Sequence, residues 1–239
     1  MDLKSKIILI SGPTASGKSK LALKIAKKIN GEIINADSMQ VYKELKILTA
    51  RPSEIDLKKI EHHLYGFRTV KKDFSSGEWL KLAKKNIKKI RDKNKIPVLV
   101  GGTGLYFKAL TDGLVKIPNI PIFFRNKIRR MQISLGQKKF YSKLLKIDPS
   151  VKNRIDPTDA QRSIRAYEVI SFTKKSIFEW YKKTKPSFRN DQFIKIYIDY
   201  PRDELISKIS KRVDQMMKNG AIQEVKDFLK LNLKSDSNI

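Results

Sequence analysis

The feature that most constrains the fold of this chain is a glycine-rich segment at residues 12–19. It reads GPTASGKS, which fits the pattern G-x-x-x-x-G-K-[ST], and it follows the apolar run IILI at residues 7–10. Such a run is typical of a buried strand in a parallel sheet, so the segment is expected to join a strand to a helix. In that setting backbone N–H groups surround an anion, Lys18 contacts its oxygens, and the Ser19 hydroxyl is suited to Mg²⁺.

This phosphate-binding loop (P-loop) predicts a site for a phosphate or a diphosphate. It does not identify the molecule that carries the phosphate, because nucleotide kinases, NTPases and diphosphate-using transferases share the loop. The residues predicted to bind the phosphate groups are Gly12, Pro13, Thr14, Ala15, Ser16, Gly17, Lys18 and Ser19.

Helical and strand patterns alternate in the first half of the chain. We expect Gly31 to end the first helix in a left-handed conformation, and a capping box of Ser75 and Glu78 to begin another helix. Strands are expected at residues 32–35 and 97–100. The apolar faces of the two helices are Leu21, Ile25 and Ile29 in the first, and Trp79, Ala83, Ile87 and Ile90 in the second. Alternation of this kind predicts a doubly wound α/β domain, which binds ligands at the carboxyl ends of its strands.

The pattern changes between residues 114 and 187, where prolines interrupt helical stretches and no comparable apolar strand is found. The earlier pattern returns with an alternating strand at residues 193–198. Two further helical faces follow, Leu205, Ile209, Val213 and Met216, then Ile222, Val225 and Leu229, ahead of a polar end at 234–239. We therefore expect an α/β fold, with a P-loop doubly wound parallel sheet at 1–113 and 188–239 and a helical insertion domain at 114–187.

The charge of the chain points to a polyanionic partner. Lys and Arg number 52 against 24 Asp and Glu, so the formal net charge is +28. Nucleic acid would explain this excess, and so would a solvated lysine-rich surface such as Lys81, Lys84, Lys85, Lys88, Lys89 and Lys93.

Composition also removes several classes of protein. The chain has no cysteine, which excludes disulfide scaffolds, thiolate zinc sites and thiol nucleophiles. It has no apolar run long enough to span a membrane, and its N-terminal apolar run is too short for a signal peptide, so we expect a cytoplasmic protein.

Polar residues follow two of the expected strands. Asp37, Ser38, Met39 and Gln40 come after the strand at 32–35, where the Asp37 carboxylate could accept a proton, hold a metal or cap a helix. A glycine-rich turn with the Thr103 hydroxyl follows the strand at 97–100, and its glycines permit close approach of a ligand.

The insertion holds a second group of candidates. Gln161, Arg162, Ser163, Ile164 and Arg165 open a helix, and arginine is suited to bidentate contact with phosphate. Two alternatives stay open: Gln161 closes a capping box with Thr158, and Arg125 is either a nucleic-acid contact or solvated. The adjacent pair His62 and His63 is not expected to bind one metal, since tetrahedral sites use wider spacings.

Taken together, these residues resemble the tRNA dimethylallyltransferase family. The similarity covers nearly the whole chain, at residues 12–19, 35–42, 49–52, 62–64, 97–106, 159–169 and 212–214, then Gly220 and 224–225. Two blocks make it specific, because P-loop kinases do not carry DSMQVY and GGTGLY together.

The resemblance implies transfer of a dimethylallyl group from dimethylallyl diphosphate to an adenosine beside the tRNA anticodon, without nucleotide hydrolysis. It implies that the P-loop holds the diphosphate with Mg²⁺ at Ser19, that Asp37 is the general base, and that Thr103 and Lys18 assist. It further implies that the insertion binds the anticodon stem-loop. The implied tRNA contacts are Asp37, Ser38, Met39, Gln40, Thr103, Arg125, Gln161, Arg162, Ser163, Ile164 and Arg165.

The chain departs from the family pattern in three places. The family's GTAKP reads LTARP at residues 48–52, and Asp156 stands where the family usually has histidine before proline. The similarity ends near residue 233, where family members usually continue through a Gly-Tyr motif and a basic helix, so the usual C-terminal segment is expected to be lacking.

Two alternatives follow from these observations. One is a nucleotide-type phosphotransferase that uses the insertion as a lid. The other is a shortened tRNA-binding relative without turnover. A monomer is expected in each case.

Overall fold

The computed structural model describes residues 3–231, so the expected polar end at 234–239 lies outside the described residues. The chain divides into two compact units, Met1–Thr111 with Pro186–Ile239, and Asp112–Lys185. These limits lie within two residues of the boundaries expected from the sequence. None of the helices in the described part of the chain is long and apolar enough to cross a membrane.

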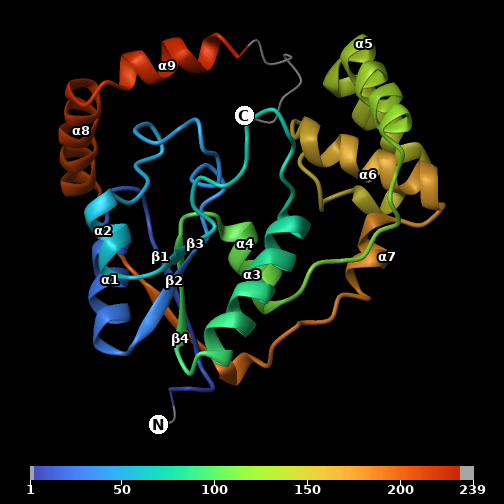
Figure 1. Cartoon of the computed structure of the whole chain (residues 1–239). Helices are drawn as coiled ribbons and strands as arrows, with labels where there is room; N and C mark the ends of the chain where they lie inside the picture. The colour runs from blue at the N-terminus through green and yellow to red at the C-terminus, as the bar shows by residue number, and fades with distance from the viewer. Residues whose placement is uncertain (1–2, 232–239) are drawn as a thin grey trace. The chain divides into compact units, whose positions relative to one another are not determined.

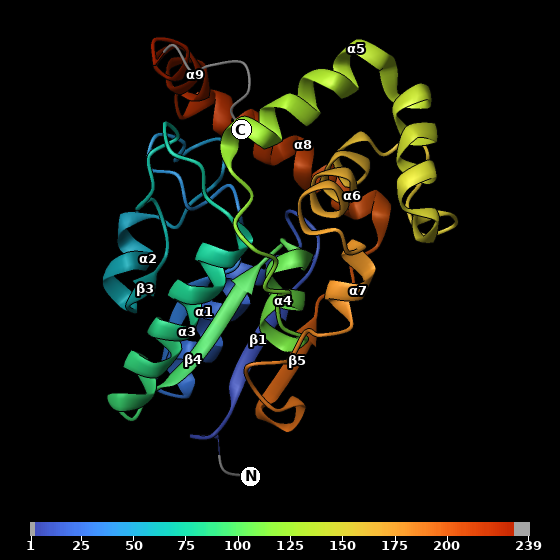
Figure 2. The same cartoon turned by 90° about the vertical axis from the view of Figure 1, so that its right-hand side faces the viewer.

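The first unit is built on a parallel sheet of five strands in the order β3-β2-β4-β1-β5 (Figures 1 and 2). The strands are β1 (Ile7–Ser11), β2 (Gly31–Asn35), β3 (His62–His63), β4 (Ile96–Gly101) and β5 (Phe193–Tyr197). The strands expected at 7–10, 32–35, 97–100 and 193–198 are confirmed. Only β3 was not expected, because two residues are too short to show a periodic pattern.

Alternate residues of the strands pack on opposite faces of the sheet. Ile7, Leu9, Ile34 and Leu99 belong to one core with α3 (Ser76–Asp92) and α4 (Gly104–Thr111). The residues of the other core are Ile8, Ile10, Ile33, Val98 and Val100, together with Ala22 and Ala26 of α1 (Lys18–Lys28). Because both faces are covered, these strands read as continuous apolar runs.

Local sequence signals set the ends of the helices. The capping box at the start of α3 is present, since the Ser75 hydroxyl accepts from Glu78 N at 3.2 Å and Ser75 N donates to the Glu78 carboxylate at 3.0 Å. The expected left-handed stop after α1 is wrong by one residue, because Asn30 has φ 54°. Gly31 is a strand residue, and a Cβ there would lie 2.8 Å from a backbone oxygen of Ile96.

Two consecutive helices follow β5 in the described part of the first unit. They are α8 (Arg202–Lys218) and α9 (Ala221–Leu229), joined at Gly220 with φ 96°. The sequence indicates an apolar face on α8, and the helix itself is confirmed, but within the described residues none of the α8 side chains is buried. The short α2 (Glu54–Lys59) completes this unit.

The second unit is helical. It comprises α5 (Ile122–Ile147), α6 (Ala160–Thr173) and α7 (Ile177–Tyr181). Its own core includes Phe140, Leu144, Ala166 and Val169. Gly136 has φ 71° and interrupts α5.

Candidate active site

The P-loop is shaped by residues in the left-handed region. Ala15 has φ 62° and Gly17 has φ 87°, and Gly17 is the N-cap of α1. Gly12 is needed for a different reason, because a Cβ there would lie 2.9 Å from the backbone oxygen of Ile198 beyond β5. The loop therefore reaches the N-terminus of α1, where the helix dipole favours an anion.

Two polar groups of the loop are suited to receive a ligand. The Lys18 ammonium donates to the Pro13 carbonyl oxygen at 3.1 Å, within the loop itself. The Ser16 hydroxyl oxygen is buried and has no hydrogen-bond partner within the described residues. A buried hydroxyl without a partner costs free energy, so an anion that accepts from Ser16 would relieve that cost.

A pocket of about 330 Å³ opens at the carboxyl ends of β2 and β4. Its polar lining includes Thr14, Lys18, Ser19, Asp37, Gln40, Thr49 and Arg212. Its apolar lining includes Met39, Leu48, Ala50, Tyr65, Ile209, Val213 and Met216. The structure thus brings the P-loop and the turn after β2 into one pocket. It also explains the unburied face of α8, since Ile209, Arg212, Val213 and Met216 lie on the pocket instead of the core.

Arg212 was missed as a site residue, although its block contributes to the resemblance. Burial lowers the pKa of Lys18, the Asp37 carboxylate partly offsets this effect, and Arg212 adds to the lowering. The three charged side chains therefore act on one another across the pocket. Burial, and then Asp37, raise the pKa of Tyr65, so its hydroxyl stays protonated.

Asp37 lies in a turn whose position is fixed by its neighbours. Asn35 is fully buried, and its side chain binds Asp37 at both the backbone N–H and the backbone oxygen, each at 2.9 Å. The Asp37 carboxylate accepts from Met39 N at 3.0 Å. The Thr103 hydroxyl accepts from Ser38 N at 2.9 Å. Thr103 therefore contacts the Asp37 turn, and its predicted catalytic role stays a prediction.

The other residues of this turn have defined places. Ser38 binds Thr103, while Met39 and Gln40 line the pocket. The Gln40 amide donates to the carbonyl oxygens of Thr49 and Ala50 at 2.8 and 3.1 Å. Their predicted contacts with tRNA stay predictions.

The insertion candidates belong to the second unit. The Glu168 carboxylate is buried there and pairs with Arg165 at 3.0 Å and with Arg125 at 3.4 Å. These two arginines are thus partly engaged inside their own unit. The capping alternative for Gln161 is wrong, because the N-cap of α6 is Asp159, whose side chain accepts from Arg162 N.

The predicted tRNA contacts on α6 differ in exposure. Gln161 and Arg162 are exposed, and Ile164 packs against the core of the second unit. Ser163 is fully buried, and its hydroxyl accepts from Gln137 at 3.2 Å. A direct contact of the Ser163 side chain with tRNA is therefore not expected, which corrects its place in the predicted site.

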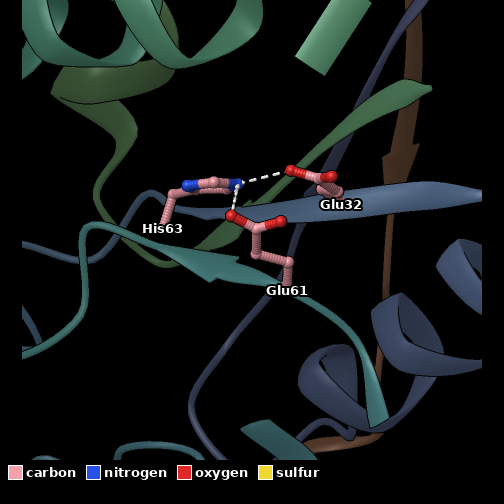
Figure 3. Close-up of side chains that lie close together, drawn as sticks. All are labelled: Glu32, Glu61 and His63. Carbon is pink, nitrogen blue, oxygen red and sulfur yellow. Dashed lines mark hydrogen bonds and ion pairs between the residues drawn. The ribbon is translucent and has the colours of Figure 1, made fainter. Parts of the chain in front are cut away.

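A second charged cluster lies at the opposite ends of the strands (Figure 3). The fully buried Glu32 accepts from Lys95 at 2.8 Å and lies 2.7 Å from His63 Nε2, while Glu61 lies 3.9 Å from the same nitrogen. These three acidic and imidazole groups are close enough to hold a metal ion. Lys93 also contacts both carboxylates, at 3.2 and 3.0 Å. Two ammonium groups therefore already supply the positive charge that a metal would bring.

Comparison with known proteins connects the chain to one family. The family model described as IPP transferase matches residues 40–239. The tRNA dimethylallyltransferase of Pelagibacter ubique (strain HTCC1062) is 61% identical over 239 residues, which is 100% of this chain and 76% of that protein. The tRNA dimethylallyltransferase of Agrobacterium fabrum (strain C58 / ATCC 33970) is 43% identical over 238 residues, which is 99% of this chain and 80% of that protein.

Solved structures agree with this match. A eukaryotic dimethylallyltransferase acting on tRNA has a TM-score of 0.82 at 29% identity, covering 96% of this chain and 58% of that chain. The tRNA isopentenylpyrophosphate transferase from Bacillus halodurans has a TM-score of 0.63 at 32% identity, covering 97% of this chain and 72% of that chain. The extent of the family match, and its agreement with the P-loop and the Asp37 turn in one pocket, show that this chain belongs to the IPP transferase family of tRNA-modifying prenyltransferases.

Proposed function

We propose that this chain transfers the dimethylallyl group of dimethylallyl diphosphate to the exocyclic N6 of an adenosine adjacent to the tRNA anticodon. The observation that carries the proposal is the mixed lining of one pocket. Lys18 and Arg212 suit a diphosphate, the apolar side chains of α8 suit a five-carbon tail, and Asp37 suits a proton to be removed. Phosphate transfer would need the cationic side chains as well, so it is the combination of all three features that favours prenyl transfer.

The reaction balances with the groups in the pocket. The adenosine N6 forms a bond to the allylic carbon as the bond between that carbon and the diphosphate oxygen breaks. The electron pair leaves with the diphosphate, whose added charge is stabilised by Lys18, Arg212 and the P-loop N–H groups. The proton lost from N6 passes to the Asp37 carboxylate. No nucleotide is hydrolysed in this step.

Magnesium fits the donors that line the pocket. Oxygen atoms are the ligands that Mg²⁺ prefers, and the Ser19 hydroxyl supplies one at the P-loop. We propose that Ser19 holds the ion against the diphosphate, where Mg²⁺ would reduce the charge of the leaving group. The buried Ser16 hydroxyl, which has no hydrogen-bond partner within the described residues, is placed to donate to an anion bound in the same loop.

The RNA part of the proposal rests on charge and accessibility. A base stacked in a stem-loop cannot enter a pocket, so the adenosine must be extruded before its amine reaches Asp37. The net charge of +28 favours phosphate contacts, and the exposed Arg162 of the insertion is one cation available for them. We assign the anticodon stem-loop to the insertion, with the protein acting as a cytoplasmic monomer.

The test is transfer of radiolabel from dimethylallyl diphosphate to unmodified tRNA in the presence of Mg²⁺. Incorporation that depends on Asp37 and is absent with Asp37→Asn supports the proposal. A chain that instead transfers phosphate from ATP to a small acceptor would overturn it. So would a chain that binds tRNA and dimethylallyl diphosphate but gives no product under any metal condition.

A further inference from the structure

Glu224 of α9 makes a contact with the pocket wall that the reaction itself does not require. Its carboxylate accepts hydrogen bonds from three successive backbone N–H groups, those of Lys46, Ile47 and Leu48. The donor–acceptor distances are 2.6, 2.8 and 2.9 Å, with a second contact to Ile47 N at 3.1 Å. Bonds from N–H groups to an ionised carboxylate are among the stronger hydrogen bonds in proteins.

The segment that Glu224 binds is a tight turn that forms one wall of the pocket. Ala50 N donates to Ile47 O at 2.9 Å, and Ala50 has φ 48°. Leu48, Thr49 and Ala50 line the pocket. Glu224 thus holds the N–H end of this turn, while Gln40 holds the carbonyl oxygens at its other end.

The helix α8, which directly precedes the helix of Glu224, forms another part of the pocket lining. Arg212 and Met216 of α8 line the pocket, and α8 joins α9 at Gly220, which lies against the Ile47 side chain. Phe228 of α9 packs on the cluster that contains Val41. One carboxylate therefore connects the turn at 46–48 to α9, the helix that follows the helix of Arg212.

We propose that Glu224 is a positioning residue of the substrate pocket, which sets the distance between the turn at 46–48 and Arg212. The inference rests on the proposed function for its activity readout. Loss of the carboxylate would release three N–H groups. The turn at 46–48 would then be less firmly held against α9 and, through Gly220, against α8. Because the groups released do not touch the reacting atoms, binding of the diphosphate should weaken more than turnover at saturation falls.

The experiment compares Glu224→Ala, Glu224→Gln and the unchanged protein. Because the lost hydrogen bonds are to a charged group, we expect the KM for dimethylallyl diphosphate to rise by about tenfold or more in Glu224→Ala. The change in kcat should be much smaller. Acetate should restore the KM of Glu224→Ala, because it supplies the missing carboxylate to the same N–H groups. It should not restore Glu224→Gln, whose amide fills the space. Asp227→Ala is the matched control, since Asp227 lies on α9 and pairs only with exposed Lys230 and Gln223 among the described residues.

A second readout is independent of prenyl transfer. The dissociation constant of inorganic diphosphate with Mg²⁺ should rise in parallel with the KM, and the amide resonances of Lys46, Ile47 and Leu48 should move in Glu224→Ala and return with acetate. If the unchanged protein transfers no prenyl group, the proposed function fails while this readout still tests Glu224. An unchanged diphosphate affinity in both Glu224 variants would overturn the inference. A lower kcat with unchanged KM and no response to acetate would also overturn it.

Discussion

Asn35 binds Asp37 at both backbone atoms, with its amide nitrogen 2.9 Å from Asp37 O and its oxygen 2.9 Å from Asp37 N. The same amide nitrogen donates to Leu64 O at 3.0 Å. One buried side chain thus fixes the turn after β2 relative to the segment after β3.

We expect Asn35→Ala to reduce turnover because the Asp37 carboxylate loses its fixed position. Buried backbone groups that lose their partner should also lower the free energy of unfolding by about 1–3 kcal/mol. Prenyl transfer and urea unfolding would measure the two effects. Asn86→Ala is the control, since the Asn86 side chain donates to Leu82 O within its own helix α3, and an equal effect in both variants would contradict the assignment.

Asp37→Asn is expected to lower kcat by at least about a hundredfold, because an amide cannot accept the N6 proton. The affinity for tRNA should stay nearly unchanged, since this variant keeps the size of the side chain and its contact with Met39 N. Filter binding and single-turnover transfer would separate the two effects. Full activity in Asp37→Asn would remove Asp37 from the role of general base.

The lowered pKa of Lys18 predicts that diphosphate binding depends on pH. Because burial lowers its pKa below the ordinary value of 10.5, the free protein begins to lose this proton at a lower pH than an exposed lysine. Diphosphate favours the protonated form, so the affinity should fall as the pH rises toward that pKa. Titration calorimetry from pH 7 upward would show the fall. It should be much weaker in Lys18→Arg, whose charge persists, and an identical slope in both proteins would count against this role.

The Glu32 cluster predicts that the fold loses stability in acid. Burial alone would raise the pKa of Glu32, but hydrogen bonds from its cationic neighbours outweigh burial and lower the pKa from 4.5 to about 2. A carboxylate with a lowered pKa stabilises the fold above its unfolded pKa, and this contribution disappears as the pH falls from about 4.5 to about 2.

Glu32→Gln should therefore cost about 3 kcal/mol at neutral pH and flatten the loss of stability in acid. Thermal unfolding of Glu32→Gln and of the unchanged protein, at neutral pH and between about pH 4.5 and about pH 2, would measure both effects. Glu54→Gln is the control, because Glu54 forms an exposed pair with Lys46. A chelator should leave the melting temperature unchanged, and a clear drop would mean that a metal contributes to the cluster.

The arginines of the insertion should separate into two groups. Arg162→Ala should weaken tRNA binding and lower the slope of log K against log salt by about 1, because its exposed guanidinium can exchange its 3.4 Å pair with Asp159 for a phosphate. Arg165→Ala removes a partner of the buried Glu168 and should mainly destabilise the protein. Binding across a salt series and denaturant unfolding would distinguish them. The same loss of binding in both variants, with no change in stability, would contradict the distinction.

The central sheet could be predicted because its signals are local. The runs at residues 7–10 of β1 and 96–100 of β4 are apolar at every position, and α3 carries both its capping box and its apolar face within one short segment. The insertion could be predicted from the break in this pattern. The P-loop could be predicted from residue types alone, since glycine and lysine at fixed spacing have a direct geometric consequence.

Contacts between distant parts of the chain could not be predicted in this way. In the sequence, Asn35 is simply one residue of an expected strand, and nothing indicates that its side chain binds Leu64. Glu224 likewise has the pattern of a surface residue in α9. The periodicity of α8 indicates an apolar face but not what that face covers. For Ile209 and Met216, that is the pocket beside the P-loop rather than the core.

This property of α8 has a thermodynamic consequence. The apolar side chains that line the pocket remain accessible to water after folding, so part of the hydrophobic free energy is released only when a ligand fills the space. Binding should accordingly carry a negative heat-capacity change, and the resistance of the protein to heat should grow with the logarithm of ligand concentration. On the proposed function, the prenyl donor itself would therefore bury the apolar side chains that folding leaves in contact with water.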